Sequence, residues 1–529
     1  MIPLPLEEIA RITGARLDGG AHPAAVVDGP VVIDSRRAGP GGLFAAVAGE
    51  RADGHDFAAA AIAAGAVAVL ATRPCGAPAL ITGNVPAALA RLAQEVVARL
   101  PQITIAGITG SSGKTSTKDL TAQLVERLGP TVAPEGSWNN EFGFPLTVLR
   151  ATRGTRYLVL ELAARGAGHI ASLCEIAPPR IGAVLNVGHA HTGEFGGIEQ
   201  VARAKGELPA ALPAAAAGGV AILNADDPRV MAMAARTEAR VVTFGLAANS
   251  ARPTSPAEPA GPIDPAGPIE LAGPADPAGP IELADPADPA GPTDPANHSS
   301  TRAPDFAAAG VRLDDLGRAS FTLLTPAGSA PVRLSLHGAH HVPNALAAAA
   351  IAAELGLGPA ETADALAAAT ARSGGRMEVR RSPAGVIVVN DAYNANPESV
   401  RAALEAVAHM ARGRRSFAVL GQMAELGDES RASHEEIGAL AAGTGVTGLI
   451  VVGKEAEPIL DGALARNGAG TEWRGEAISV PDGPAAVAAL RGRLADGDVV
   501  LVKASHAAGL ERVAAQLLSQ PDLVKEKAQ

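Results

Sequence analysis

Cysteine is scarce in this chain, which has only Cys75 and Cys174 among its 529 residues and no Cys-x-x-Cys pair. A disulfide framework and a thiolate metal site are therefore not expected, and a reducing compartment is the natural setting. No uninterrupted apolar run reaches the roughly 18 residues that a membrane-spanning helix needs. The first ten residues include Glu7 and Glu8 where a signal peptide would have its apolar core. We expect no membrane span and a cytoplasmic location.

Aromatic residues are also rare, at 2% of the chain, and no cluster of lysine and arginine is long enough to follow a phosphate backbone. Alanine, valine, leucine and isoleucine must therefore fill the hydrophobic cores. The net charge of −11 argues against nucleic acid as a partner. A chain of this length should form about three domains. These features predict an acidic, soluble, multidomain enzyme.

The most informative stretch is Ile103–Thr117, a short β-branched apolar run followed directly by a Gly-rich turn that ends in Lys-Thr. Gly110 and Gly113 allow a tight turn whose N–H groups point inward. Lys114 supplies a positive charge for the β- and γ-phosphates, and Thr115 offers a hydroxyl to Mg²⁺. An amphipathic run stopped by Gly-Pro follows, so we interpret the segment as strand, phosphate loop and helix rather than an ordinary Gly/Ser turn. The predicted nucleotide contacts are Gly110, Ser111, Ser112, Gly113, Lys114, Thr115 and Ser116.

Apolar strands alternate with helical stretches after this loop, as is typical of a parallel α/β sheet. The predicted strands are Tyr157–Glu161, Ile181–Asn186, Gly219–Asn224 and Arg240–Phe244. Ligands bind beyond the carboxyl ends of such strands, so Glu161 and Asn186, which close two of them, are candidate site residues.

The shortened loop Thr-Gly-x-x-Gly-Lys-Thr after a strand resembles the Mur ligase family, the ATP-dependent amide-forming enzymes of peptidoglycan assembly, and the folylpolyglutamate synthases. The resemblance implies an α/β protein of three domains. They are an N-terminal domain that binds the UDP-muramoyl substrate (residues 1–102), a central ATP-binding domain with a P-loop ATPase-like parallel sheet (103–372), and a C-terminal Rossmann-like ligase domain (373–529).

The N-terminal segment carries Asp-Ser-Arg at residues 34–36 and a Gly-Glu-Arg-x-Asp-Gly-His-x-Phe run at residues 49–57. Taken alone, it predicts two short strands and a polar loop without a function. Both motifs resemble the UDP-sugar-binding domain of Mur ligases that act on extended muramoyl peptides. The resemblance implies that Ser35 and Arg36 face the uridine diphosphate, with Gly49 and His55 nearby; a purely structural role is the alternative.

The same resemblance implies two Mg²⁺ ions beside ATP. Glu161 would be a carboxylate ligand of the ion that Thr115 also contacts, and its alternative is a solvated glutamate at a strand end. In the Asn-x-x-x-x-His pattern that starts at Asn186, His191 would bind the second ion. In Ala-Lys-Gly-Glu, Lys205 would be carbamylated by CO₂ into an anionic ligand, whereas the residues alone indicate a surface lysine on a helix.

Two further segments match family patterns. Ser137–Pro145 is similar to an Asn-Asn-Glu-x-Gly-x-Pro segment, which implies that Asn140 contacts the muramoyl substrate. Leu336–Ala350 is similar to a segment that begins a helix at the nucleotide base, which implies a role for Asn344 in ATP binding. Without the family, Asn344 would be a helix N-cap. His341 stands where the family often has an asparagine that contacts adenine.

In the last domain, Ser-Gly-Gly-Arg places Arg376 over the ATP phosphates by resemblance. Asp391-x-Tyr-Asn-Ala-Asn-Pro resembles one family branch, the enzymes that add D-alanyl-D-alanine. It implies that Asp391 binds the ribose. The implied substrate contacts are Tyr393, Asn394, Asn396 and Lys503. His506 replaces the arginine of the family's Lys-Gly-Ser-Arg segment, and a histidine would grip a carboxylate less well.

Residues 250–304 change character abruptly to repeats of Pro-Ala-Gly-Pro-Ile-Asp and related sequences. Dense proline and few apolar residues predict an extended, solvated insertion without a catalytic role. Its own role is left open.

The resemblance implies ligation of D-alanyl-D-alanine to UDP-N-acetylmuramoyl-tripeptide through an acyl phosphate, with ADP and phosphate as products and with Lys114, His191, Lys205 and Arg376 as catalytic residues. We expect a monomer. The alternatives are a tripeptide-forming ligase, whose Asp-Asn-Pro-Arg motif is absent, a folylpolyglutamate synthase, and a nucleotide-binding module without catalysis. The sequence does not distinguish diaminopimelate from lysine in the tripeptide.

Overall fold

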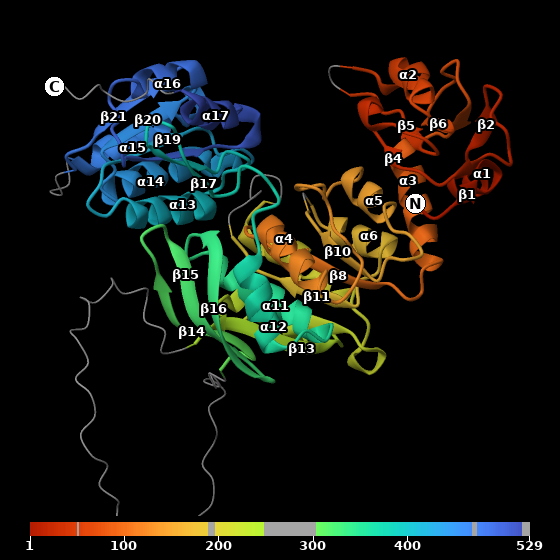
Figure 1. Cartoon of the computed structure of the whole chain (residues 1–529), viewed down its shortest axis with the longest axis horizontal. Helices are drawn as coiled ribbons and strands as arrows, with labels where there is room; N and C mark the ends of the chain where they lie inside the picture. Colours follow the sequence, from red (N-terminus) through yellow and green to blue (C-terminus); the bar gives the residue numbers. More distant parts are fainter. Residues whose placement is uncertain (50–51, 165, 189–195, 248–302, 468–472, 521–529) are drawn as a thin grey trace, which may run out of the picture.

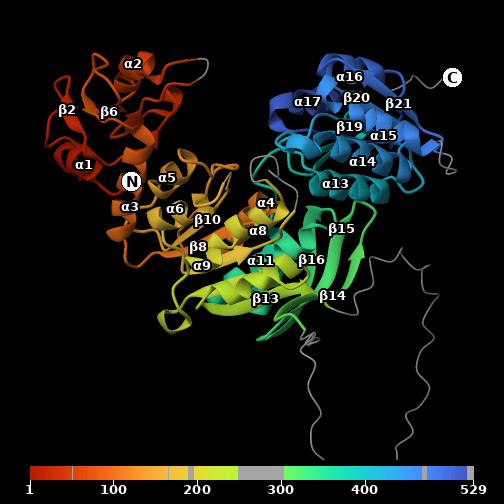
Figure 2. The same cartoon turned by 180° about the vertical axis from the view of Figure 1, so that it is seen from behind.

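The computed structural model describes residues 1–49, 52–164, 166–188, 196–247, 303–467 and 473–520. Three α/β units follow one another along the chain, each built on its own main sheet. The N-terminal and C-terminal units lie apart from each other, and each lies against the central one (Figure 1, Figure 2). The predicted α/β class with three domains is confirmed.

The N-terminal unit has a five-stranded sheet in the order β2-β7-β6-β5-β4, in which only β2 is antiparallel to its neighbour. Its strands are β1 (Leu4–Pro5), β2 (Arg16–Asp18), β3 (Val26–Val27), β4 (Val31–Val32), β5 (Leu43–Ala45), β6 (Ala68–Ala71) and β7 (Ala79–Ile81), and its helices are α1 (Leu6–Thr13), α2 (Ala58–Ala63) and α3 (Val85–Ala98). The sequence predicted two short strands, whereas the unit has more, because strands of two or three residues are too short to show an alternating pattern.

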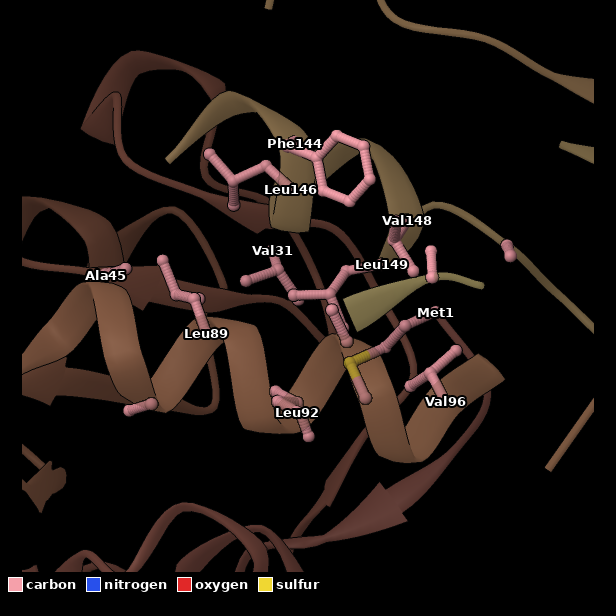
Figure 3. Packing of buried hydrophobic residues seen from close by; sticks show 14 of the residues in the cluster. Met1, Val31, Ala45, Leu89, Leu92, Val96, Phe144, Leu146, Val148 and Leu149 are labelled. Carbon is pink, nitrogen blue, oxygen red and sulfur yellow. The ribbon is translucent and has the colours of Figure 1, made fainter. Parts of the chain in front are cut away.

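Helix α3 joins the first two units. Leu89, Leu92 and Val96 on one face of α3 are buried in a single cluster with Phe144 and Leu149 of the central unit (Figure 3). Burial of large apolar side chains contributes roughly 1.5 to 3 kcal/mol each. This shared core fixes the N-terminal unit on the central one.

The central unit has a nine-stranded sheet in the order β16-β15-β14-β13-β12-β11-β8-β10-β9. In this order, neighbouring strands from β14 through β8 to β9 pair in parallel, whereas β14, β15 and β16 form an antiparallel edge. The strands are β8 (Thr104–Thr109), β9 (Thr131–Val132), β10 (Tyr157–Glu161), β11 (Ile181–Val184), β12 (Val220–Asn224), β13 (Arg240–Leu246), β14 (Phe306–Leu313), β15 (Arg318–Thr325) and β16 (Gly328–His337). The helices are α4 (Lys114–Val125), α5 (Gly143–Val148), α6 (His169–Ile176), α8 (Ile198–Lys205), α9 (Glu207–Ala210), α10 (Pro228–Met231), α11 (His341–Glu354) and α12 (Pro359–Ala368). The four strands predicted here are present, but β11 ends at Val184, two residues before the predicted end at Asn186.

Alanine fills much of the central core, beside Phe244, Phe306 and Phe321. Helix α11 buries residues Ala345–Ala352, which are mostly alanine, in one cluster with Leu120 and Leu124 of α4. Small side chains allow the two helices to approach closely, so the paucity of aromatic residues does not leave the core poorly packed.

The C-terminal unit has a six-stranded sheet in the order β17-β18-β22-β19-β20-β21, parallel except for β17. The strands are β17 (Glu378–Arg381), β18 (Ile387–Asn390), β19 (Ser416–Leu420), β20 (Gly448–Val452), β21 (Glu476–Val480) and β22 (Val499–Lys503), and the helices are α13 (Pro397–Met410), α14 (Ser430–Gly443), α15 (Glu457–Asn467), α16 (Gly483–Leu490) and α17 (Glu511–Ser519). Separate apolar clusters cover its two faces, as expected for a Rossmann-like sheet.

The insertion predicted at 250–304 lies almost entirely outside the described residues. Its flanks are strands β13 and β14, which pair in parallel from Phe244 with Phe306 to Leu246 with Ala308. The insertion therefore leaves the sheet between two adjacent, paired strands. In the part of the chain that the structure describes, no helix is long and apolar enough to cross a membrane.

Candidate active site

The phosphate loop joins β8 to α4. Gly113 has φ +79°, and a Cβ atom placed there would lie 2.4 Å from Oδ1 of Asn344, so glycine is required both by conformation and by space. Lys114 Nζ donates to the Gly110 carbonyl at 2.6 Å, and the ammonium thus lies folded back over the loop. Burial lowers the pKa of Lys114, while the nearby Glu161 carboxylate opposes this shift.

The end of β11 fixes the other side of the loop. Asn186 Oδ1 accepts from the Ser112 N–H at 2.9 Å, and its Nδ2 donates to the Ser112 carbonyl at 3.2 Å. Gly188 N–H donates to the Ser111 hydroxyl at 2.8 Å. Asn186, which lies two residues beyond the end of β11, therefore holds the phosphate loop in register with the sheet. This fits the rule that ligand sites form beyond the carboxyl ends of parallel strands.

Glu161 closes β10 and is 1% exposed, so the alternative of a solvated strand-end glutamate is wrong. Thr115 Oγ1 donates to its Oε2 at 3.0 Å, and Ser137 Oγ and Asn139 Nδ2 donate to its Oε1 at 3.2 and 2.6 Å. A buried carboxylate needs such partners. Glu161, Thr115 and Ser137 thus place carboxylate and hydroxyl oxygens together directly beside the phosphate loop, and the Asn139 amide supports the carboxylate.

Arg376 reaches this cluster from the segment that leads into the C-terminal unit. Its Nη2 donates to Thr115 Oγ1 at 3.1 Å and to Ser137 Oγ at 3.3 Å. Its guanidinium carbon lies 4.5 Å from the centre of the Tyr393 ring, within the range of a cation–π contact. The buried Nε atom has no hydrogen-bond partner among the described residues. Arg376 thereby brings a permanent positive charge to the phosphate loop.

Lys205 is the last residue of α8 and is 4% exposed, so the alternative of a surface lysine is wrong. Burial lowers its pKa well below the usual value, and repulsion from Lys114 lowers it further. A buried lysine that is repelled by a second lysine is unfavourable in its charged form unless it is neutral or modified.

Asn344 lies beside Gly113 of the phosphate loop. It belongs to α11, whose N-cap is His340, so the capping alternative for Asn344 is wrong. His341 is 3% exposed, and its Nδ1 has no partner among the described residues; the same holds for Nδ1 of His340. Burial lowers the pKa of His340 to about 4 and that of His341 well below its usual value. Both rings are therefore neutral near pH 7.

Asp391 and Lys503 form a buried ion pair in the wall that the C-terminal unit contributes. Lys503 Nζ donates to Asp391 Oδ2 at 2.6 Å and to the Asn394 carbonyl at 2.8 Å. Asp391 Oδ1 accepts from the Met377 N–H at 3.1 Å. The pair thus ties together the strand ends of β18 and β22 and the segment after Arg376. His506 is exposed and stacks on Tyr393 with ring centres 5.3 Å apart.

A cavity of about 410 Å³ lies between the central and C-terminal units. Its walls combine residues far apart in sequence, including Lys114, Glu161, His341, Arg376, Asp391, Tyr393 and Lys503. Most predicted nucleotide contacts, the Glu161 cluster and the C-terminal candidates thus face one space. Cations and hydroxyls of this kind at the end of parallel strands suit a phosphate-bearing ligand.

Other predicted residues lie elsewhere. Ser35 and Arg36 belong to the N-terminal unit and do not line this cavity; Arg36 forms an exposed pair with Asp34 at 2.7 Å. His55 is buried, with its Nδ1 2.6 Å from Asp53 Oδ1. Asn140 is exposed, and its side chain accepts from the Gly143 N–H at 2.8 Å at the start of α5. His191 lies outside the described residues.

The sequence did not single out Ser137 and Asn139, which contact Glu161 directly. Two neighbouring asparagines offered equal candidates, and a loop without periodicity gives no sign of which one points inward. The role of Lys118 and Asp119 was also missed. Both are buried in α4, where Lys118 Nζ donates to the Pro134 carbonyl at 2.9 Å. Charged residues in the middle of an amphipathic pattern look like solvent-facing positions.

Comparisons with known proteins agree along almost the whole chain. The family model described as Mur ligase middle domain matches residues 108–257, the one described as Mur ligase, glutamate ligase domain matches residues 375–506, and the one described as Mur ligase family, catalytic domain matches residues 30–107. The UDP-N-acetylmuramoyl-tripeptide–D-alanyl-D-alanine ligase of Mycobacterium tuberculosis is 45% identical over 98% of this chain and 98% of its own length. The enzyme of the same name from Escherichia coli is 32% identical, over 97% of this chain and 98% of its own.

Solved structures show the same fold. MurF from Acinetobacter baumannii superposes with a TM-score of 0.75 and 26% identity over 98% of this chain and 99% of its own. MurF ligase from Thermotoga maritima, solved in complex with ADP, gives a TM-score of 0.69 with 28% identity over 92% and 96% of the two chains. With three family models in order and relatives that match from end to end, this chain belongs to the Mur ligase family.

Proposed function

We propose that this protein is an ATP-dependent amide-forming ligase that attaches D-alanyl-D-alanine to UDP-N-acetylmuramoyl-tripeptide, with ADP and phosphate as the other products. The observation that carries the proposal is the 45% identity, over 98% of both chains, with a ligase of that name. The cavity between the central and C-terminal units supplies the chemical setting. The product would be the pentapeptide precursor of peptidoglycan, so the activity would serve cell-wall synthesis, cell shape and division.

The residues present fit ATP. The turn from Gly110 to Gly113 offers backbone N–H groups, and Lys114 and Arg376 offer positive charge for the phosphates. At the start of α11, the buried and unpartnered Nδ1 of His341 is available to a heterocyclic base, in the same cavity as Asn344. Buried polar atoms without partners in a protein commonly have a ligand as partner. Asp391 is the candidate for the ribose.

The residues also fit Mg²⁺, which prefers oxygen ligands and usually keeps several waters beside phosphate groups. Glu161 supplies a carboxylate, and Thr115 supplies a hydroxyl 3.0 Å from it. Among the described residues, no three histidine, cysteine, aspartate or glutamate side chains gather in one place. A single carboxylate is a sparse ligand set for two ions. We propose His191 and carbamylated Lys205 as the further ligands.

Carbamylation suits the surroundings of Lys205. Its lowered pKa leaves a share of neutral amine that can attack CO₂, with loss of one proton and formation of an N–C bond. The product is a carboxylate-like anion. It would replace the repulsion between Lys205 and Lys114 by attraction, and bound Mg²⁺ would supply further charge neutralisation.

Amide formation from a carboxylate requires activation, since the carboxylate is a poor electrophile. In the proposed reaction the tripeptide carboxylate attacks the γ-phosphorus of ATP, giving an acyl phosphate and ADP. The amine of D-alanyl-D-alanine then attacks the acyl carbon, loses a proton and expels phosphate. Lys114 and Arg376 would stabilise the charge that develops on the transferred phosphoryl group, which is the main contribution a protein makes to such a step.

The proposed substrate positions rest on the resemblance of these segments to Mur ligases. Ser35 and Arg36 are the candidates for the uridine diphosphate, and Asn140 is the candidate for the muramoyl part. Tyr393, Asn394, Asn396 and Lys503 would surround the reacting ends. We keep the domain limits 1–102, 103–372 and 373–529. A cytoplasmic monomer remains our expectation.

An ADP-release assay tests the proposal. Purified protein with ATP and Mg²⁺ should release ADP only when both a UDP-muramoyl-tripeptide and D-alanyl-D-alanine are present. The diaminopimelate and lysine forms of the tripeptide, assayed in parallel, would identify the third residue. UDP-muramoyl-dipeptide with diaminopimelate or lysine tests for a tripeptide-forming ligase. Nucleotide binding without ADP release under any of these conditions would instead indicate a module without catalysis.

A further inference from the structure

Helix α4 carries the phosphate loop at its start and a row of polar side chains along one face. Asp119 and Gln123 follow Thr115 at intervals of four residues, so the three side chains lie on the same side of the helix. Each of the three contacts a different residue of the segment that connects α12 to the C-terminal unit. The contacts are spaced four residues apart on the helix, which is about 6 Å along its axis.

The first contact is between Gln123 and Thr370. The Gln123 amide donates to the Thr370 carbonyl at 2.9 Å and accepts from the Thr370 N–H at 3.0 Å. Both backbone groups of Thr370 are thereby satisfied by one side chain. This double hydrogen bond fixes the position of the connecting segment along the helix.

The second contact, one turn nearer the phosphate loop, is between Asp119 and Ser373. Asp119 Oδ2 accepts from the Ser373 N–H at 2.9 Å, and both residues are 6% exposed. The buried ammonium of Lys118 pairs with Asp119 and also donates to the Ser373 hydroxyl at 3.4 Å. Because the pair is buried, removal of one partner would leave an uncompensated charge in the interior and would destabilise the fold more than the loss of a surface ion pair.

The third contact is between Thr115 and Arg376, at 3.1 Å. The connecting segment thus advances three residues for each turn of α4, from Thr370 through Ser373 to Arg376, and runs antiparallel to the helix. On its outer side, Arg372 grips the Glu126 carboxylate with two hydrogen bonds of 2.5 and 2.6 Å.

The C-terminal unit holds the segment from the other direction. The Gly375 carbonyl accepts from the Tyr393 N–H at 3.2 Å, and the Met377 N–H donates to Asp391. Met377 has φ +47°, a conformation that non-glycine residues adopt only when their surroundings impose it. Gly374 is the residue between Ser373, which bonds to α4, and Gly375, which bonds to the C-terminal unit. A Cβ atom placed on it would have no atom within 4 Å.

We propose that α4 sets the position of Arg376 through its contacts with the connecting segment. Asp119, Gln123 and Glu126 are positioning residues that set the register of residues 370–373 along α4, so that Arg376 meets the phosphate loop at Thr115. The inference rests on the proposed function of Arg376 in phosphoryl transfer, but none of the three positioning residues touches the reacting atoms. The same rigid helix presents Lys114 and aligns Arg376, which keeps the two cations in a fixed relation.

The test uses the full-length protein and compares kcat with KM. Gln123→Ala removes both hydrogen bonds to Thr370 without touching the cavity. A shift of about 1 Å in a group that acts in the transition state lowers turnover by about tenfold to a hundredfold. We expect a loss of that size in kcat, with the KM for ATP changed less than about twofold, because the phosphate loop itself is intact.

The Glu126–Arg372 pair allows a rescue experiment. Glu126→Arg should lower kcat, and the double variant Glu126→Arg with Arg372→Glu should restore most of it, because the pair is re-formed with reversed charges. Arg493→Glu, which breaks a comparable exposed pair with Glu476 at 2.9 Å in the C-terminal unit, is the matched control and should leave kcat unchanged.

Outcomes separate the inference from the function on which it rests. Wild-type ADP release that depends on D-alanyl-D-alanine tests the function alone. If wild type is active and Gln123→Ala retains full kcat at unchanged thermal stability, the inference that α4 positions Arg376 is wrong. It is equally wrong if the double variant is no more active than Glu126→Arg. A fall in melting temperature that parallels the fall in kcat would also overturn the inference, because it would indicate a merely structural role.

Discussion

The Asn139 side-chain amide lies 2.6 Å from Oε1 of Glu161, and Glu161 is almost completely buried beside the phosphate loop. Asn139 belongs to a loop without regular structure, whereas Glu161 ends a strand. The amide orients the carboxylate and leaves its other oxygen to Thr115. If Glu161 binds Mg²⁺, then Asn139 is the outer partner that fixes the direction of the ligand.

Asn139→Ala should therefore raise the Mg²⁺ concentration needed for half-maximal activity, by about tenfold to a hundredfold as is typical for an outer partner of a metal ligand. A titration of initial rate against Mg²⁺ measures this. Asn140→Ala is the companion variant, and it should change the KM for the muramoyl peptide and leave the Mg²⁺ requirement alone. The interpretation fails if Asn139→Ala has the wild-type Mg²⁺ dependence.

Lys114→Ala should lower turnover by about three orders of magnitude, because the ammonium that would stabilise the transferred phosphoryl group is removed. The folded state should be at least as stable as wild type, since burial disfavours the charged form of Lys114 and this burden disappears with the side chain. ADP release and thermal unfolding measured on one preparation test both statements. Retained activity would contradict the assignment.

Lys205→Ala should abolish activity, and a short carboxylic acid such as acetate should restore part of it by occupying the space of the carbamate. Lys205→Arg is the control, because it keeps a positive charge but cannot be carbamylated, and it should be neither active nor rescued. Carbon-13 NMR of wild type in labelled bicarbonate should give a carbamate signal that Lys205→Ala lacks. An unmodified lysine in fully active enzyme would rule the carbamate out.

Much of this site could be predicted from the sequence, because strand ends and glycine turns leave local signs. The phosphate loop, Glu161 and Asn186 all follow short apolar runs, and the chain direction alone brings such positions to one edge of a parallel sheet. The shared cavity of Lys114, Arg376 and Asp391 needed more, since their approach depends on how two separate sheets are oriented.

What the sequence could not provide is burial of charged residues through contacts remote along the chain. Lys118 looks like an exposed helix position, yet it is 1% exposed because Pro134 and Ser373 cover it. Lys205 is similar, since a lysine at the end of a polar helix gives no local sign of a buried environment. Several short strands of the N-terminal unit also escaped notice, because two or three residues cannot display a period.

The two buried histidines predict how stability depends on pH. Burial lowers the pKa of His340 to about 4, compared with about 6.5 in an unfolded chain. Between these two pKa values the unfolded chain binds more protons than the folded protein. The contribution of His340 to the free energy of unfolding is therefore fully present above about pH 6.5 and is lost as the pH drops toward 4. The difference of about 2.5 units corresponds to roughly 3 kcal/mol.

Urea unfolding of the central unit, followed at pH 7.5 and at pH 5, should show the loss, and His340→Gln should reduce it. His341, whose pKa is lowered in the same direction by burial, would account for part of the remainder. A His340→Gln variant with the same pH dependence as wild type would contradict the contribution of this residue.

Removal of residues 251–300 should leave turnover within about twofold of wild type. Strands β13 and β14 pair in parallel only through the last three residues of one and the first three of the other, so the chain has to step back by about two residues between them. Along and across the sheet this separates the two strand ends by about 8 Å. The nine residues that remain, 247–250 and 301–305, span up to about 30 Å when extended, which is ample. Asp305 also stays in place, with its carboxylate 2.9 Å from the Thr243 N–H, and anchors the start of β14.

ADP release and melting temperature of the chain without residues 251–300 test this prediction together. A shortened protein that melts like wild type but has lost activity would show that the insertion contributes to catalysis, whereas loss of both would place its contribution in the fold.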